Sequence, residues 1–409
     1  MNKLSDTMKR YCGHALYFSL FVLVAGFFVV PESSRYHTIV YLGFYIPALS
    51  AALLHARELG RTLATDPAWQ IFTVLMLWLG ISTLWSSFDD AAHLVKLLLM
   101  LWLLALAVRL MLDNMSSFNA SFSLALAVAA VVIIVTVIAH LVTTGTDFYL
   151  WRLSHLGGRS MSAVTVGEIS AIFMLYCLMQ ARLVVTPGLR KVYIVMAVVF
   201  LLALLLSFSR TAFLALFLAA VWHYLQLGKF RAALIVVAAT ILLLLLMLMD
   251  IDVEWLRNIS RSSTVEIRLW GWQATLEQIR EHWLLGYGAR SDLQLPLDDP
   301  RYIEIGEPFW HPHNVFLSVW YQAGLIGLVL LVALVVALAR KLRPLQGDRQ
   351  TSYWSTIFIF VLLICLVDSP ALVDRPATPW IWFWLPLAIA LSSDKIPAGS
   401  RSDPQTNPP

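Results

Sequence analysis

The segment VYIVMAVVFLLALLLSFSRTAFLALFLAAVWHYLQL, residues 192–227, decides the fold class of this chain. Two apolar runs, 192–207 and 211–227, flank a short break whose only Lys, Arg, Asp or Glu is Arg210. Each run approaches the roughly 20 residues that a helix needs to cross a hydrocarbon layer about 30 Å thick. The segment therefore predicts two consecutive transmembrane helices that meet at one membrane boundary, with Arg210 at that boundary.

The rest of the chain repeats this pattern. Of its 409 residues, 59% are hydrophobic and 13% are charged, whereas a soluble domain is about 45–50% apolar and about 25% charged. Because a soluble fold could not bury so much apolar surface, we predict an all-α integral membrane protein with about 12 transmembrane helices. We expect no nucleic-acid partner. The predicted spans are 14–30, 38–54, 68–84, 91–112, 119–142, 162–183, 192–207, 211–227, 232–250, 313–339, 352–368 and 377–392.

Charge in the short loops gives the predicted orientation. Basic residues cluster in loops such as 182–191, which are therefore predicted to be cytoplasmic together with both termini. Four regions follow in chain order, namely helices one to nine, a large outer loop, helices ten to twelve and a disordered cytoplasmic tail. Their boundaries are 1–250, 251–312, 313–392 and 393–409.

The large outer loop is predicted to contain one amphipathic helix. Ser263 and Glu266 have the spacing of a capping box, and Gly286 to Gly288 supply a stop signal. Two tryptophans contribute to an apolar stripe, which predicts a helix that lies along the membrane interface. The stripe consists of Leu269, Trp272, Leu276, Ile279 and Trp283.

The predicted outer side carries arginines rather than lysines. Only one lysine, Lys96, falls on or near that side. A guanidinium binds phosphate through two parallel hydrogen bonds and keeps its charge in a low dielectric, so this bias favours an anionic ligand. Ion pairs with the acids of the same loop are the alternative interpretation. The outer arginines include Arg152, Arg159, Arg210, Arg268 and Arg290.

The sequence PFWHPHN, residues 308–314, is the strongest local signal. Pro312 suits the first turn of a helix, which would place His313 at a helix start on the outer boundary. The helix dipole and nearby arginines disfavour the imidazolium there, and a neutral histidine can accept a proton as a general base. Two alternatives remain: a capping or packing role beside Trp310, and a metal site formed with His311 and the acids of the loop.

A second group surrounds Arg210. Ser207, Ser209 and Thr211 offer hydroxyl donors beside its guanidinium, an arrangement that can hold phosphate oxygens. A snorkelling interfacial arginine is the alternative. Asp368 is predicted on the same face, where it can orient an arginine or the histidine.

Several of these motifs together resemble those of bacterial O-antigen ligases. His313-Asn314 is followed after nine residues by Gly324-Leu325-Ile326-Gly327. Ser207 to Arg210, Arg268 with Trp270, and Leu285 to Gly288 also resemble that family, in its usual order. The resemblance covers nearly the whole chain, because the number of helices and the late large loop agree as well.

The resemblance implies a GT-C-like fold in the bacterial inner membrane, with the large loop and the active site in the periplasm. It implies transfer of an O-antigen polysaccharide from undecaprenyl diphosphate to the lipid A–core oligosaccharide, without metal or cofactor. On this pattern His313 is the general base of an inverting reaction. Arg210 and Arg268 hold the diphosphate. Further helpers and supporting residues are Arg290, Arg152, Arg159, Asn314, Ser209 and Asp368.

Other functions share part of this pattern. O-antigen polymerases use the same donor but generally have two notable periplasmic loops, and protein O-oligosaccharyltransferases usually run longer. A transporter or flippase for lipid-linked sugars predicts charged or broken helices at mid-membrane. Most spans here are uninterrupted apolar runs with ionisable groups at the outer rim, which favours an enzyme with a one-sided site.

Overall fold

A computed structural model describes residues 2–88, 90–144, 152–248, 263–293, 311–343, 349–368 and 373–396. Nearly all of these residues are helical, and the predicted all-α fold is confirmed. The one β-structure in the described ranges is a small antiparallel hairpin of β1 (His155–Leu156) and β2 (Arg159–Ser160).

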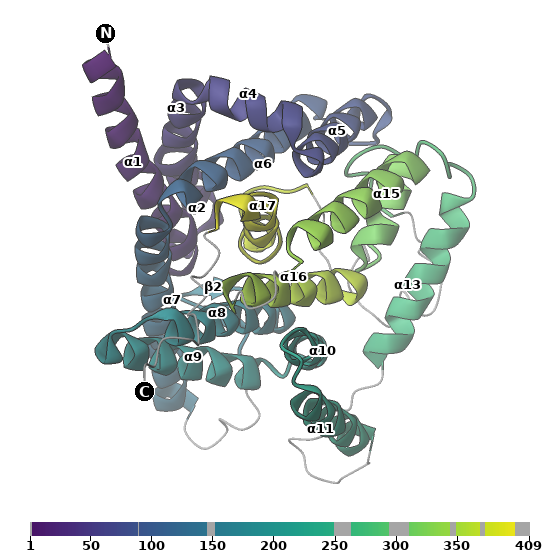
Figure 1. Ribbon diagram of the computed structural model, residues 1–409. Helices are drawn as coiled ribbons and strands as arrows, with labels where there is room; N and C mark the ends of the chain where they lie inside the picture. Colours follow the sequence, from purple (N-terminus) through teal and green to yellow (C-terminus); the bar gives the residue numbers. More distant parts are fainter. Residues whose placement is uncertain are drawn as a thin grey trace.

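The helices keep the labels of Figure 1. The first half contains α1 (Asn2–Val29), α2 (Ser33–Val40), α3 (Ile46–Leu54), α4 (Ala56–Thr65), α5 (Pro67–Ser82), α6 (Ala91–Met111) and α7 (Met115–Thr144). The second half contains α8 (Ala163–Leu183), α9 (Pro187–Ser207), α10 (Arg210–Gln226), α11 (Phe230–Leu248), α13 (Ser263–Ile279), α15 (Val315–Lys341), α16 (Arg349–Val367) and α17 (Leu385–Leu391). One π-helical turn, Tyr41–Tyr45, joins α2 to α3, and another, Trp380–Trp384, precedes α17.

Each predicted span corresponds to helical residues, and two of them, 38–54 and 377–392, combine a π-helical turn with α-helix. Within the described ranges, 7 helical segments are long and apolar enough to cross a membrane. One of them, Ala91–Thr143, comprises both α6 and α7 and therefore covers two predicted spans. Shorter apolar helices occupy Phe230–Ile241, Ser352–Val367 and Trp380–Leu391. Several helices thus have the length and composition of a membrane span, whereas a total of twelve crossings stays a prediction.

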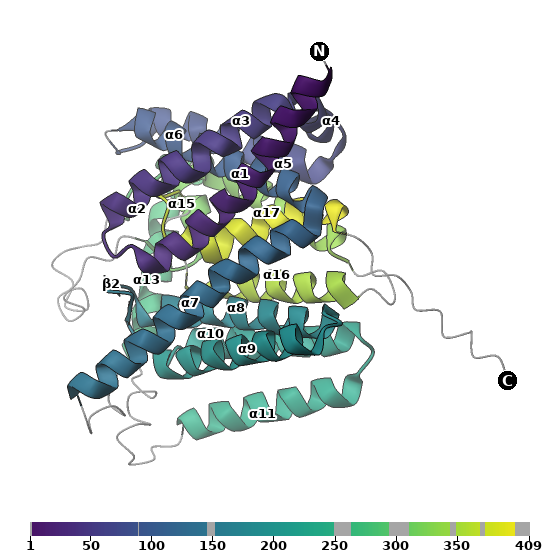
Figure 2. The same ribbon diagram turned by 90° about the vertical axis from the view of Figure 1, so that its left-hand side faces the viewer.

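Apolar side chains are buried at the centre of the bundle and exposed at its periphery, as in proteins that are surrounded by lipid. Helix α8 lies at the centre of the bundle, and 83% of the residues in its most apolar stretch are buried. Peripheral helices direct large apolar side chains outward, among them Leu77, Leu99 and Val142. Figures 1 and 2 show α11 at the periphery beside α10, while α13 flanks α15 at another edge in Figure 1.

Five helices define two ends of the bundle. Helices α8, α10 and α15 begin at one end, and α9 and α16 finish there. The 21 residues of α8 span about 30 Å at 1.5 Å per residue. The residues at its two ends are therefore separated by about the thickness of a membrane.

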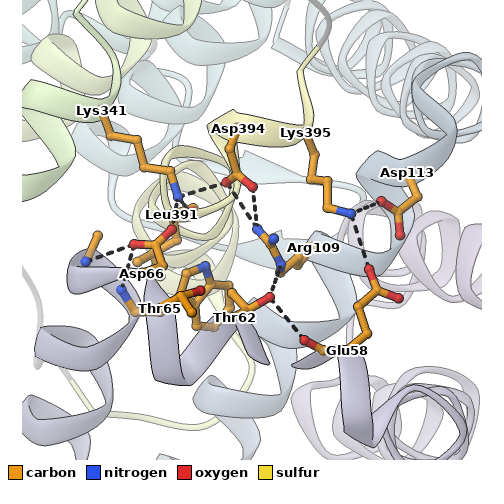
Figure 3. Close-up of polar contacts among 12 residues, drawn as sticks. Glu58, Thr62, Thr65, Asp66, Arg109, Asp113, Lys341, Leu391, Asp394 and Lys395 are labelled. Atoms are coloured by element: carbon orange, nitrogen blue, oxygen red, sulfur yellow. Dashed lines mark hydrogen bonds and ion pairs between the residues drawn. The ribbon is translucent and has the colours of Figure 1, made fainter. Parts of the chain in front are cut away.

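A network of ion pairs occupies the other end (Figure 3). Asp394 accepts from Arg109 and Lys341, which links α6 to α15. Lys395 pairs with Glu58 and Asp113. Burial acts to raise the pKa of the Asp394 carboxyl, but Lys341 and Arg109 hold it below its usual range.

Two boundaries differ from the prediction. The disordered tail was expected from residue 393, but Ser393–Lys395 forms a 3-10 turn because the ion-pair network fixes it. Helix α13 ends at Ile279 instead of continuing to Gly286. Residues 397–409 and most of the large loop, 249–262 and 294–310, lie outside the described ranges.

The predicted apolar stripe on α13 contacts two environments. Ile279 is buried, as is Trp270, which was not part of the stripe. Leu269, Leu276 and Trp283 are instead exposed. The apolar residues therefore face both the bundle and its surroundings, and the placement of α13 along a membrane interface stays a prediction.

Candidate functional site

His313 lies immediately before the cap of α15. Helix α15 begins at Val315, and the Asn314 side chain accepts hydrogen bonds from the backbone N–H groups of Phe316 and Leu317. The expectation that Pro312 occupies the first helical turn and His313 the helix start is therefore wrong. His313 adopts a left-handed backbone conformation with φ of 50°, which is uncommon for a residue with a side chain.

Asn314 joins this turn to the end of α16. Its Nδ2 donates to the carbonyl oxygen of Leu366 at 2.9 Å. Asp368 follows two residues later and brings its carboxylate to His313, with 3.1 Å between Oδ1 and Nδ1. One asparagine thus caps a helix and also fixes the separation between the histidine and its acid.

The Asp368 carboxylate binds two partners. Its second oxygen, Oδ2, accepts from Nη2 of Arg268 at 3.0 Å. The Asp368 and Arg268 side chains are only 16% and 17% exposed, so this ion pair is weakly screened by solvent. The result is a chain of three groups, in which one acid connects the histidine with an arginine.

Helix α13 positions these three groups through two of its side chains. Arg268 and Trp272 stand one turn apart on it, so their side chains share a face. The Trp272 indole donates to the carbonyl oxygen of Pro312 at 2.8 Å. The same helix therefore fixes both the arginine and the turn that carries His313.

The predicted group around Arg210 forms a tight turn between α9 and α10. Phe208 has φ of 50°, and Ser209 caps α10 by accepting from the backbone of Ala212. A Cβ atom at Gly167 would lie 2.6 Å from Oγ of Ser207, so the turn packs closely on α8. Ser209 is buried in this turn. Its hydroxyl therefore has a structural role, in addition to any contact with a ligand.

Two further arginines converge on this turn. The Nε of Arg152 donates to the carbonyl oxygen of Ser207 at 2.8 Å. Burial lowers the pKa of the Arg152 guanidinium, and the like charge of Arg210 lowers it further. Arg210 in turn lies within electrostatic reach of Arg268. Like charges gathered in this way are typical of a site for an anionic ligand.

Glu168 is a member of the site that the sequence reasoning missed. It lies on α8, is 2% exposed, and interacts electrostatically with Asp368 and Arg268. Its Oε1 has no hydrogen-bond partner among the described residues. A carboxyl inside a span that is otherwise apolar was the available signal, because such groups are costly in a membrane and usually functional.

Arg290 lies outside the group formed by His313, Asp368 and Arg268, on a separate loop. Its guanidinium pairs with Asp374 at 3.2 Å and lies over the ring of Phe88. The residue has φ of 60°, and the loop around it is tied down by Ser86, which donates to the carbonyl oxygen of Ala289.

Arg159 has contacts that indicate a structural brace. It is 8% exposed and donates to the carbonyl oxygen of Val30 and the hydroxyl of Ser33, which joins β2 to α1 and α2. Its guanidinium also lies over the rings of Phe27 and Tyr36. These contacts give Arg159 a structural role, and its contact with the diphosphate stays a prediction.

The two glycine motifs meet beside the site. Gly324 interrupts α15 with φ of 67° and ψ of −171°, a region open essentially to glycine alone. The carbonyl oxygens of Tyr321 and Gln322 then accept from the backbone of Tyr287 and Gly288. A Cβ atom at Gly324 would lie 2.0 Å from the carbonyl oxygen of Leu284. The break in α15 therefore positions the loop that carries Arg290.

His311 supports the turn. Its Nδ1 accepts from the backbone N–H of His313, and the two rings are 4.4 Å apart. Burial, followed by the influence of His313, lowers its pKa to about 4. Within the described ranges no three His, Cys, Asp or Glu side chains could together hold a metal. The loop acids of the metal alternative, Asp298, Asp299, Glu304 and Glu307, lie outside those ranges.

The fold and site define a multi-pass membrane protein in which a histidine, acids and arginines gather at one end of the helices. Residues 195–332 match the family described as O-antigen ligase. An O-antigen ligase of Pseudomonas aeruginosa is 27% identical over 404 residues, covering 95% of this chain and 93% of that protein. A Rickettsia conorii protein named "Putative polysaccharide ligase" is 27% identical over 106 residues, 25% of this chain and 26% of its own length. The matches confirm the resemblance of this chain to the O-antigen ligase family.

Proposed function

We propose that this protein transfers an O-antigen polysaccharide from undecaprenyl diphosphate to the lipid A–core oligosaccharide, on the periplasmic face of the bacterial inner membrane. The observation that carries the proposal is the Asp368 carboxylate, which contacts His313 through one oxygen and Arg268 through the other. A base and a phosphate-binding group are thereby held in one unit. The ligase relatives support the reaction type.

His313 activates the acceptor in this proposal. Because Asp368 accepts the hydrogen bond from Nδ1–H, the imidazole keeps its lone pair on Nε2. Nε2 removes the proton from the acceptor sugar hydroxyl. The carboxylate then stabilises the imidazolium that forms, as in other acid-oriented histidine bases.

The bond changes follow from an in-line displacement. The acceptor oxygen attacks the anomeric carbon of the donor while the bond from that carbon to the diphosphate oxygen breaks on the opposite face. The configuration at the anomeric carbon is therefore inverted. Undecaprenyl diphosphate leaves with the bonding electron pair, and the proton stays on His313.

The arginines stabilise the leaving group. Arg210, Arg152 and Arg268 surround the point where negative charge develops on the diphosphate, and charge-assisted hydrogen bonds are strongest where water is excluded. Arg268 also orients Asp368, so departure of the diphosphate and uptake of the proton are electrostatically linked. Arg290 offers a further contact for an anionic substrate at the edge of the site.

The test uses purified protein, lipid-linked O-antigen and lipid A–core in detergent with EDTA. We expect the wild type to form high-mass lipopolysaccharide, and His313→Ala to form none. His55→Ala is the matched control. Its ring bonds to the carbonyl oxygen of Ala51, and the helix that follows it, α4, belongs to the ion-pair network at the other end of the bundle, through Glu58 and Lys395.

Three results would contradict parts of the proposal. A wild type that extends the donor but leaves lipid A–core unmodified is a polymerase. Activity lost in EDTA and restored by a divalent cation refutes the metal-independent mechanism. Full activity of His313→Ala refutes the assignment of the base.

A further inference from the structure

A cavity of about 460 Å³ lies between α10, α15 and α16, far from the site. Its walls include Trp222, Gln226, Arg340, Arg343, Ser355 and Phe358. These residues come from the last turns of α10, from the C-terminal end of α15 and the residues just after it, and from the first half of α16. Arg210, Asn314 and Asp368 stand at the opposite ends of the same helices. From Arg210 to Gln226 helix α10 rises about 24 Å, so the cavity lies near the other membrane boundary.

The polar wall of the cavity is cationic. Arg340 lies in the last turn of α15 and Arg343 lies two residues beyond its end, and both are exposed. Neither forms an ion pair with any residue in the described ranges, whereas Lys341 between them pairs with Asp66 and Asp394. Two guanidinium groups three residues apart in the sequence, at the C-terminal end of a helix, can bind the oxygens of one phosphate.

A hydroxyl donor lies in the same wall. Ser355 Oγ accepts from the indole of Trp222 at 3.1 Å and from Nε2 of Gln226 at 2.9 Å. Since a serine hydroxyl has two acceptor positions and one hydrogen, both acceptor positions are filled and the hydrogen remains to be donated. This arrangement suits an acceptor such as a phosphate oxygen.

The remaining wall is apolar. Val336, Phe358 and Ile359 line it, and Trp222 is 41% exposed at its rim. Tryptophan is typical of the boundary between hydrocarbon and headgroups. A free phosphate ion gains nothing from such a wall, whereas the chains of a lipid do.

We propose that this cavity binds an anionic phospholipid of the membrane leaflet opposite the site. Arg340 and Arg343 hold its phosphodiester, Ser355 donates to a phosphate oxygen, and the acyl chains lie along Phe358 and Ile359. Basic pockets between transmembrane helices bind such headgroups in general. The proposal is independent of the reaction at the other end of the helices.

The experiment measures thermal unfolding of delipidated, full-length protein in detergent while one lipid is titrated. The probes are phosphatidylglycerol, zwitterionic phosphatidylcholine and inorganic phosphate. We expect phosphatidylglycerol alone to raise the unfolding temperature in a saturable way, because a ligand that binds only the native state stabilises it. Arg340→Gln with Arg343→Gln should weaken this binding at least tenfold.

Arg231→Gln is the matched control, because Arg231 is an exposed arginine at the start of α11, on the same side but outside the cavity. Its titration should equal that of the wild type. If the double glutamine variant does not fold, a double lysine variant replaces it, and we expect weaker binding there as well because the fork is lost. Equal binding by wild type and the folded double variant overturns the proposal, and so does an equal shift with inorganic phosphate or phosphatidylcholine.

Discussion

Asp368→Asn is the most informative substitution in the proposed mechanism. The change preserves the size of the side chain but removes the charge that joins His313 to Arg268. An asparagine oxygen can still accept from one of these donors, while its NH₂ group then faces the other donor. The base loses the carboxylate that stabilises its protonated form, and Arg268 loses its counter-charge.

The expected loss is large in rate and smaller in stability. Positioned acid–base catalysis contributes about 10²–10⁴-fold, which corresponds to about 3–5 kcal/mol in the barrier. Removing one partner of a fully buried ion pair costs about 3–5 kcal/mol of stability. Asp368 is 16% exposed and the asparagine retains a hydrogen bond, so a cost of about 1–3 kcal/mol is expected here.

The assay compares kcat with the unfolding temperature in the same preparation. Asp113→Asn is the control, because it makes the same chemical change in an ion pair with Lys395 at the other end of the bundle. We expect the control to keep its activity within about twofold, in line with the small contribution of exposed pairs. If Asp368→Asn keeps kcat within about threefold of wild type, the acid does not act through His313 and the mechanism is wrong.

Four further outcomes are expected. Arg210→Lys should lower kcat at least tenfold, because lysine keeps the charge but not the fork; full activity would refute bidentate phosphate binding. Glu168→Gln should unfold at the wild-type temperature or above, since it removes a buried carboxyl with an unpaired oxygen. Its activity should fall about tenfold, and unchanged turnover would show that Glu168 has no role in the reaction. Gly324→Ala should lower the unfolding temperature sharply through its clash with Leu284, whereas Gly60→Ala, in open space on α4, should be neutral or stabilising. Burial lowers the pKa of His311 to about 4 in the folded protein, so on acidification the unfolded chain takes up this proton first. The free energy of unfolding should therefore decline between about pH 6.5 and pH 4, by at most about 3 kcal/mol. In calorimetry, His311→Asn should flatten that decline.

The helices could be read from the sequence because the membrane imposes a length and a composition on them. The run 192–207 matches the end of α9, and 211–227 matches α10 within one residue. The capping box at Ser263 likewise marks the start of α13. The predicted end of α13, at the glycine signal, is wrong. The helix ends earlier, at Ile279, and the residues that follow bond to the backbone of α15.

The sequence grouped the candidate arginines by side of the membrane, but it could not separate them by role. Arg159 and Arg152 are seven positions apart and are predicted on the same face, yet one braces α1 and α2 while the other contacts the turn beside Arg210. Their roles depend on which aromatic rings and carbonyl oxygens the tertiary fold brings close. A pattern of residue types along the chain contains no such information.

Backbone strain connects the motifs to the chemistry. Three residues with side chains have positive φ in the described ranges, namely Phe208, Arg290 and His313. Each costs of order 1–3 kcal/mol and persists only where its surroundings hold it. Each stands in or next to one of the motifs that sequence reasoning selected.

For His313 these constraints can be named. Asn314 caps α15 and binds the carbonyl oxygen of Leu366, and Trp272 binds the carbonyl oxygen of Pro312 on the other side. The turn is thus fixed at both ends, and from it the imidazole reaches Asp368. The pairing of histidine with asparagine in the motif follows from this geometry: the histidine supplies the chemistry, and the asparagine supplies the strained position from which the histidine reaches its acid.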